Sequence, residues 1–132
     1  MKRRSFLKTA CLASSCLLPA CKSTMVHVES KRVRKQIFIE KTLFNHRSNV
    51  TVAYNKYAIG VVKFDNDHFA ASLLACTHNG CALTPTELGF ICPCHGARFD
   101  ALGQVKKGPA EQNLTRFITS TNSQSVIIHL TD

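Results

Sequence analysis

The chain has 132 residues, a formal net charge of +9, 45% hydrophobic residues and seven cysteines. This length accommodates one domain and a leader, and the composition is that of a globular protein rather than a disordered one. No apolar run reaches the roughly 20 residues that a membrane-spanning helix needs. The charge does not indicate nucleic-acid binding, because the leader supplies much of it and no basic patch interleaved with aromatic residues follows.

The first 20 residues have the pattern of an export signal. A basic segment, residues 2–8, precedes a short apolar segment from Thr9 to Ala20. The adjacent Arg3 and Arg4 resemble a twin-arginine signal. An ordinary secretion signal with a chance pair of arginines is the alternative.

The apolar segment ends at Leu18-Pro19-Ala20-Cys21, which resembles a bacterial lipobox, in which the cysteine is lipid-modified and becomes the first mature residue. Pro19 is an uncommon residue at its position, and cleavage that leaves Cys21 as a free thiol is the alternative. Residues 21–35 show no apolar periodicity and carry five basic residues against one acidic residue, which predicts a solvated flexible tether with a span of roughly 20 Å. Its basic residues could also contact anionic lipid headgroups.

From Gln36 onward, short runs of β-branched and aromatic residues alternate with polar ones. They predict strands at residues 36–40, 49–54, 57–64, 68–75, 90–91, 114–119 and 126–130. No helical stripe follows the leader. Short strands at this spacing predict an all-β sandwich or barrel over residues 36–132.

Two boxes of cysteine and histidine carry the strongest functional signal. The first reads CTHNGC from Cys76 to Cys81, and the second reads CPCHG from Cys92 to Gly96. A Cys-x-His pair and a Cys-x-x-His pair supply two thiolates and two imidazoles, which are donors for iron–sulfur clusters and for zinc. Histidines in place of two thiolates make a cluster less negative and therefore easier to reduce.

These boxes resemble those of the Rieske [2Fe–2S] family, in the disulfide-containing branch of quinol–cytochrome complexes and arsenite oxidase small subunits. The resemblance is strong over Ala75–Ala110 and extends over about residues 36–130. It implies an antiparallel β sandwich or barrel with a small two-loop subdomain that binds the cluster. It also implies that one iron is held by two cysteines and the other by two histidines, which here are Cys76, Cys92, His78 and His95.

The same resemblance gives roles to residues that are not ligands. It implies a disulfide between Cys81 and Cys94 that clamps the two loops, and a covering loop at Gly108-Pro109. The residues that would surround the cluster are Asn79, Gly80, Gly96, Ala97 and Phe99.

Three of these residues depart from the quinol branch. Asn79 stands where an apolar residue is common, Ala97 where a serine is common, and Phe99 where a tyrosine is common. The loop between His78 and Cys92 is also slightly short for the family. These departures weaken the inference that the partner is a quinol.

The resemblance implies one-electron transfer in the bacterial cell envelope by a component of a larger oxidoreductase, without catalytic residues of its own. The expected partners are a quinol or a molybdenum oxidoreductase large subunit on one side, and a cytochrome or cupredoxin on the other. Export in the folded state suits a cluster inserted in the cytoplasm, and a disulfide suits the oxidising periplasm.

Other interpretations remain open. One is the iron–sulfur subunit of a quinol–cytochrome complex, although such subunits usually keep a membrane-spanning N terminus that this leader is too short to supply. Another is a stand-alone redox carrier or sensor. A Cys2His2 zinc site uses the same four donors, but zinc does not need the second cysteine pair or the glycine–proline loop. Tyr54 and Tyr57 are expected to be packing residues, and the histidines outside the boxes are expected to be surface or strand residues rather than ligands.

Overall fold

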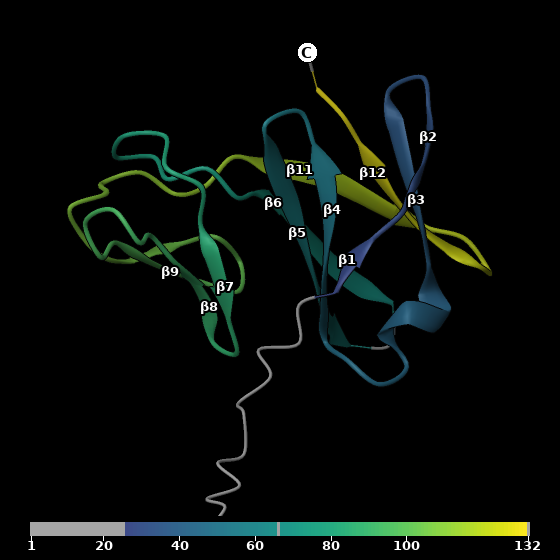
Figure 1. Ribbon diagram of the computed structural model, residues 1–132. Coiled ribbons are helices and arrows are strands. Elements are labelled where there is room, and N and C mark those ends of the chain that lie inside the picture. Colours follow the sequence, from purple (N-terminus) through teal and green to yellow (C-terminus); the bar gives the residue numbers. More distant parts are fainter. Residues whose placement is uncertain (1–25, 66, 132) are drawn as a thin grey trace, which may run out of the picture.

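The computed structural model describes residues 26–65 and 67–131, and the regular elements in these ranges are short strands and one 3-10 helix (Figure 1). The elements are β1 His27–Val28, β2 Lys31–Val33, β3 Gln36–Glu40, a 3-10 helix η1 Lys41–Phe44, β4 Asn49–Tyr54, β5 Tyr57–Asp65, β6 His68–Leu73, β7 Thr84–Thr86, β8 Gly89–Ile91, β9 Arg98–Asp100, β10 Val105–Lys107, β11 Arg116–Thr121 and β12 Ser125–His129. The predicted all-β fold is confirmed. No helix in the described ranges is long and apolar enough to cross a membrane.

The strands form two sheets, and all their pairings are antiparallel except that of β1 with β4. The larger sheet has the order β1-β4-β5-β6-β11-β12-β3-β2 and curls around its own core (Figure 1). We call this sheet, with η1, the base. The smaller sheet has the order β10-β9-β8-β7 and lies beside the base. We call residues 74–114, which contain it, the insert.

Alternation along the strands builds the core of the base. In β3, Ile37 and Ile39 are buried, while Gln36 and Phe38 are only partly buried. Strands β4, β5 and β12 each bury two branched apolar side chains at alternate positions, which are Val50, Val52, Ile59, Val61, Val126 and Ile128. Burying one branched side chain of this kind contributes roughly 1.5–3 kcal/mol. The inward faces of the curled sheet therefore hold the base together.

The insert leaves the base after β6 and returns to it at β11, and these two strands pair with each other. The backbone N–H of Leu73 donates to the carbonyl of Thr115 over 2.8 Å, directly at the junction. Gly60, on β5, brings the two sheets close together, because a Cβ there would lie 2.9 Å from Cε1 of Phe90. The central strand of the base thus supports the insert directly.

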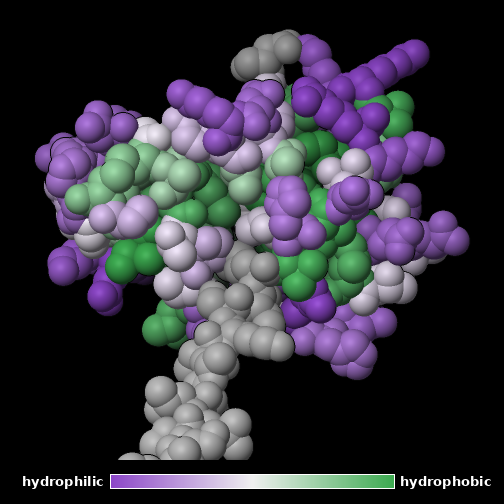
Figure 2. Space-filling view, in the orientation of Figure 1, coloured by the Kyte–Doolittle hydropathy of each residue, from purple (hydrophilic) through white to green (hydrophobic). Residues whose placement is uncertain are grey.

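The N-terminal boundary of the folded part differs from the prediction. Residues 21–35 were expected to form a tether, but β1 and β2 lie within this range and pair with β4 and β3. Strand pairing uses backbone hydrogen bonds, so an exposed edge strand needs no apolar periodicity. Side chains of β2 are all exposed, and the surface around the β2–β3 turn is largely hydrophilic (Figure 2). The leader and Cys21 lie outside the described residues.

Candidate metal centre

The first cysteine–histidine box folds into a tight turn. The backbone N–H of Cys76 donates to the carbonyl of Cys81 over 2.8 Å, and the N–H of Gly80 donates to the carbonyl of Cys76 over 2.7 Å. Gly80 has a φ of 72°, in the left-handed region that glycine adopts without a steric penalty.

The second box repeats this turn with the same spacing. Here the N–H of Cys92 donates to the carbonyl of Ala97 over 2.8 Å, and the N–H of Gly96 donates to the carbonyl of Cys92 over 2.9 Å. Gly96 has a φ of 75°, close to that of its counterpart Gly80. Two turns of one backbone form therefore present the two boxes.

Cys76 and Cys92 are free thiols that lie side by side in the core of the insert. Their exposed fractions are 3% and 1%, and their sulfur atoms share a hydrogen bond. Burial raises the pKa of the Cys76 thiol, against the effect of the backbone N–H groups of His78 and Asn79, which donate to its sulfur.

The second thiol has matching donors. Burial disfavours the thiolate of Cys92 too, but the N–H of Cys94, the thiol of Cys76 and the N–H of His95 together outweigh it and lower the pKa of Cys92. In each turn, the backbone amides two and three residues after the cysteine thus donate to its sulfur. These amides favour negative charge on both sulfurs, outweighing the effect of burial on the pKa of Cys92 but not on that of Cys76.

The histidines of the two boxes meet on the outside of the same site. His78 and His95 are exposed, and their ring centroids lie 5.0 Å apart with an interplanar angle of 87°. The structure thus brings two buried sulfur donors and two exposed nitrogen donors together. Such a set fits a binuclear iron–sulfur cluster, which the two cysteines and the two histidines would hold, because thiolates and imidazoles are the two kinds of donor that such a cluster uses.

A disulfide joins the two turns, as the sequence predicted. Cys81 and Cys94 are bonded, with Cα atoms 6.5 Å apart. Their sulfur atoms and that of Cys92 all lie within 4.8 Å of one another. Because Cys81 and Cys94 are bonded to each other, this group is a clamp beside Cys92 rather than a three-thiolate metal site.

The expected neighbours of the site lie around it. Ala97 and Phe99 are buried at 0% and 3% exposure, in the same apolar cluster as the two free cysteines, and neither carries a hydroxyl group. The Gly108–Pro109 peptide is cis, and both residues are exposed. The next residue, Ala110, is buried in this cluster and attaches the loop to the insert.

Two contacts of the first turn involve residues that were not assigned to the site. The hydroxyl of Tyr57, on β5, donates to the carbonyl of Gly80 over 2.9 Å. The hydroxyl of Thr77 donates to the carbonyl of Gln112 over 2.7 Å, which links the first turn to the segment after the Gly108–Pro109 peptide. The sequence gives no signal for the first contact, because its partners are 23 residues apart in different elements.

Asp100 organises the β9–β10 turn, which leads toward the Gly108–Pro109 loop. Its carboxylate accepts the backbone N–H groups of Leu102 and Gln104, each over 2.9 Å, and lies 3.1 Å from the ammonium of Lys106. These partners lower the pKa of Asp100 although burial acts in the opposite direction. An aspartate followed by a glycine three residues later is a turn signal that the sequence does contain.

Comparisons with known proteins show which family this arrangement resembles. The Rieske [2Fe-2S] domain family matches residues 20–118. The iron-sulfur subunit of ubiquinol-cytochrome c reductase from Rickettsia typhi is 41% identical over 56 residues, which are 40% of this chain and 32% of that protein. The iron-sulfur subunit 2 of the cytochrome b6-f complex from Trichormus variabilis is 51% identical over 41 residues, which are 30% of this chain and 23% of that protein.

A solved structure is similar over more of the chain. The plasma membrane Rieske protein of Synechocystis PCC 6803 aligns with a TM-score of 0.59 and 30% sequence identity, over 67% of this chain and 93% of that one. By contrast, the match spans only about a quarter to a third of the length of the two curated relatives named above.

The clamp between the two turns gives a first prediction. Cys81→Ser and Cys94→Ser each remove the same bond, so each should lower the free energy of unfolding by about 2–5 kcal/mol. Cofactor insertion should still occur, but the loaded protein should lose its cofactor faster, because the turns can separate. Denaturant unfolding and the decay of visible absorbance measure the two effects. Equal losses in both variants are expected, and free thiols at both positions in the exported wild type would contradict the clamp.

Proposed function

Because this chain belongs to the Rieske [2Fe–2S] family, its cofactor is a [2Fe–2S] cluster, and we propose that it transfers single electrons in the bacterial cell envelope. The proposed ligands are the cysteines and histidines that the two turns bring together, which are Cys76, Cys92, His78 and His95. The observation that carries this proposal is the convergence of two adjacent buried thiols and two exposed imidazoles from turns of one form.

The chain's own residues support such a role in two ways. When bound, the cluster accepts and releases one electron at a time. The backbone amides that donate to Cys76 and Cys92 would stabilise negative charge on the sulfurs. His78 and His95 are exposed, so their ring nitrogens can contact a partner. Electron exchange would therefore take place at this surface.

The partner is proposed to be a larger oxidoreductase. Relatives of the chain are named as iron-sulfur subunits of ubiquinol-cytochrome c reductase and of the cytochrome b6-f complex. These names support a subunit role in a quinol–cytochrome complex. The other proposed setting, beside a molybdenum oxidoreductase large subunit with a cytochrome or cupredoxin as the second partner, rests on the sequence alone. Asn79 is exposed next to His78, so the surface beside the cluster is more polar than a quinol site would need.

We also propose that the chain is exported by the twin-arginine route and anchored by a lipid on Cys21. The position of Val26, the first described residue, is compatible with such an anchor. The carbonyl of Val26 accepts a hydrogen bond from the N–H of Thr51, near the start of β4, whereas the β4–β5 turn lies at the other end, beside Gly80. Cys21 is five residues before Val26, at most about 17 Å of extended chain. An anchor there would hold the start of β1 within that distance of the bilayer.

The identity of the ligands is tested by metal analysis. Protein isolated from its own host should contain two irons and two acid-labile sulfides per chain, and His78→Ala should lose them, because an iron without its ligand is open to solvent. His46→Ala is the matched control, since His46 is exposed and lies in a different part of the fold. Stoichiometric zinc without iron in the native preparation would sink the proposal in favour of a Cys2His2 zinc module.

The absence of two hydroxyl groups beside the cysteines bears on the redox potential. Hydrogen bonds to cluster sulfurs favour the reduced state, and Ala97 and Phe99 can provide none from their side chains. If each bond contributes roughly 1.5–3 kcal/mol, the double variant Ala97→Ser with Phe99→Tyr should raise the midpoint potential on the order of 0.1 V. Potentiometric titration measures it, with Phe64→Tyr as a control far from the site. No upward shift would mean that backbone donors or solvent exposure dominate.

The lipid anchor has its own test. Cys21→Ala should release the protein from membranes and change its gel mobility, whereas Cys16→Ala, within the expected signal peptide, should do neither. Replacing both Arg3 and Arg4 with lysine should leave the precursor in the cytoplasm. If Cys21→Ala stayed associated with membranes, the proposed lipid anchor would be wrong, and the proposed electron transfer would be unaffected.

A further inference from the structure

The two turns of the metal centre share one backbone form but differ in what supports them. A Cβ added at Gly80 would lie 3.4 Å from the hydroxyl oxygen of Tyr57, whereas one added at Gly96 would meet no atom within 4 Å. The first turn therefore abuts the base at the position where the second turn is open. This asymmetry is not required by the repeat, so the contact of Tyr57 calls for a physical explanation.

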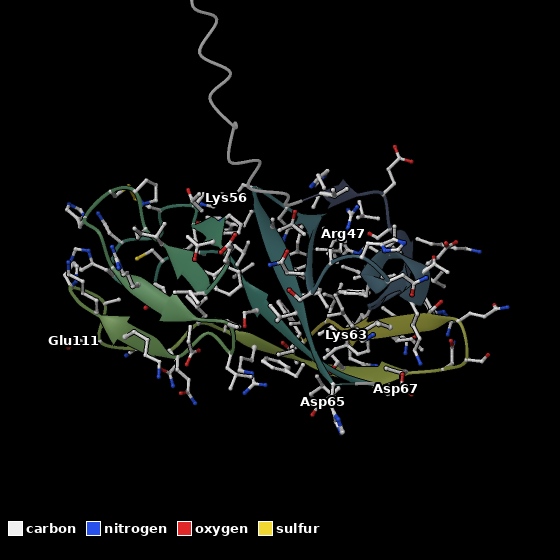
Figure 3. All side chains as sticks on the ribbon, turned by 90° about the horizontal axis from the view of Figure 1, so that it is seen from below. Arg47, Lys56, Lys63, Asp65, Asp67 and Glu111 are labelled. Atoms are coloured by element: carbon white, nitrogen blue, oxygen red, sulfur yellow. A yellow bond between two sulfur atoms is a disulfide. The ribbon has the colours of Figure 1, made fainter. Side chains whose placement is uncertain are left out.

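Tyr57 is well placed to hold the first turn. It is the first residue of β5, a central strand of the base, and its backbone pairs with Tyr54 across a two-residue turn. Its half-buried ring lies 5.1 Å from the ammonium of Lys56, and Figure 3 shows Lys56 on the side of the insert, away from Lys63. The hydroxyl donates to the carbonyl of Gly80 over 2.9 Å. A strand in the interior of the larger sheet thus contacts the first turn through this hydrogen bond.

The bond acts on the backbone that surrounds the Cys76 sulfur. Gly80 is tied to Cys76 by its N–H, and the amides of His78 and Asn79, which donate to that sulfur, lie in the same turn. Fixing the carbonyl of Gly80 therefore limits how far these donors can move. The contact between Thr77 and Gln112 restrains the same turn from another side.

We propose that Tyr57 is a positioning residue that holds the first turn, and with it the amide donors of Cys76, against the base. This inference rests on the proposed ligand role of Cys76. Because fixed donors stabilise the more negative reduced state, the Tyr57 hydroxyl raises the midpoint potential and slows cofactor loss. Tyr57 thereby links the base to one half of the metal centre, while the second turn depends on the disulfide and the insert alone.

The test is Tyr57→Phe in the cofactor-loaded full chain, with Tyr54→Phe as the control. Both changes remove one phenolic hydroxyl, but Tyr54 packs edge-on against Phe117, with ring centroids 5.7 Å apart, instead of meeting the turn. Hydrogen-exchange mass spectrometry should show amides of residues 77–80 exchanging about 2–10-fold faster in Tyr57→Phe, as expected for one lost hydrogen bond. Exchange over residues 93–96 should be unchanged, and the midpoint potential should fall.

Other outcomes overturn the inference. Unaltered exchange of the first turn would show that the hydroxyl does not hold it, and equal acceleration in both turns would indicate general loosening of the insert. Faster amide exchange in the first turn with an unchanged midpoint potential would show that Tyr57 supports the fold without affecting the sulfur donors. Iron analysis of the wild type is independent of all three results, so a wrong cofactor assignment is distinguishable from a wrong role for Tyr57.

Discussion

Two sulfur atoms buried side by side constrain almost everything else in the insert. A thiolate in an apolar environment is unstable unless hydrogen bonds compensate for the water it has lost. The backbone provides them only if the chain folds back sharply after each cysteine, so that two amides face the sulfur. That turn requires a left-handed residue four positions on, where the chain has Gly80 and Gly96. The spacing of each box thus follows from the solvation of its sulfur.

The base meets a different requirement, which is to hold one turn still while the outer side of the site stays open. Its sheet is tightly packed, with Val50, Val52 and Val61 fully buried. It approaches the insert at Gly60, where Phe90 packs closely, and at Tyr57, which bonds to Gly80. The histidines on the outer side remain exposed because the base contacts the insert from behind.

Much of this arrangement could be predicted from the sequence. The strands at residues 36–40 and 49–54 have the predicted bounds, because each runs long enough to show alternation. The Cys81–Cys94 pairing was also predicted, since the two boxes carry a specific family pattern. Local patterns of this kind are readable because all the residues that make them lie within a few positions.

The features that the sequence did not predict are very short or fully exposed strands and a contact between residues far apart in the chain. Strands β7, β9 and β10 have three residues each, too few to show a period. Strand β2 is wholly exposed, so its sequence resembles a solvated tether. The contact from Tyr57 to Gly80 depends on how the insert is placed against the base, which no local pattern encodes.

The junction between base and insert has a consequence for how the two parts can vary. At the junction the N–H of Leu73 donates to the carbonyl of Thr115, and the N–H of Leu74 donates to the carbonyl of Ala58. The entropic cost of closing a loop grows only slowly with its length, so the strands that carry the insert depend little on how long it is. A redox centre built on such a loop behaves as a cassette: its interior can be lengthened, shortened or exchanged without altering the ladder that carries it, provided that the contacts at Gly60 and Tyr57 are kept.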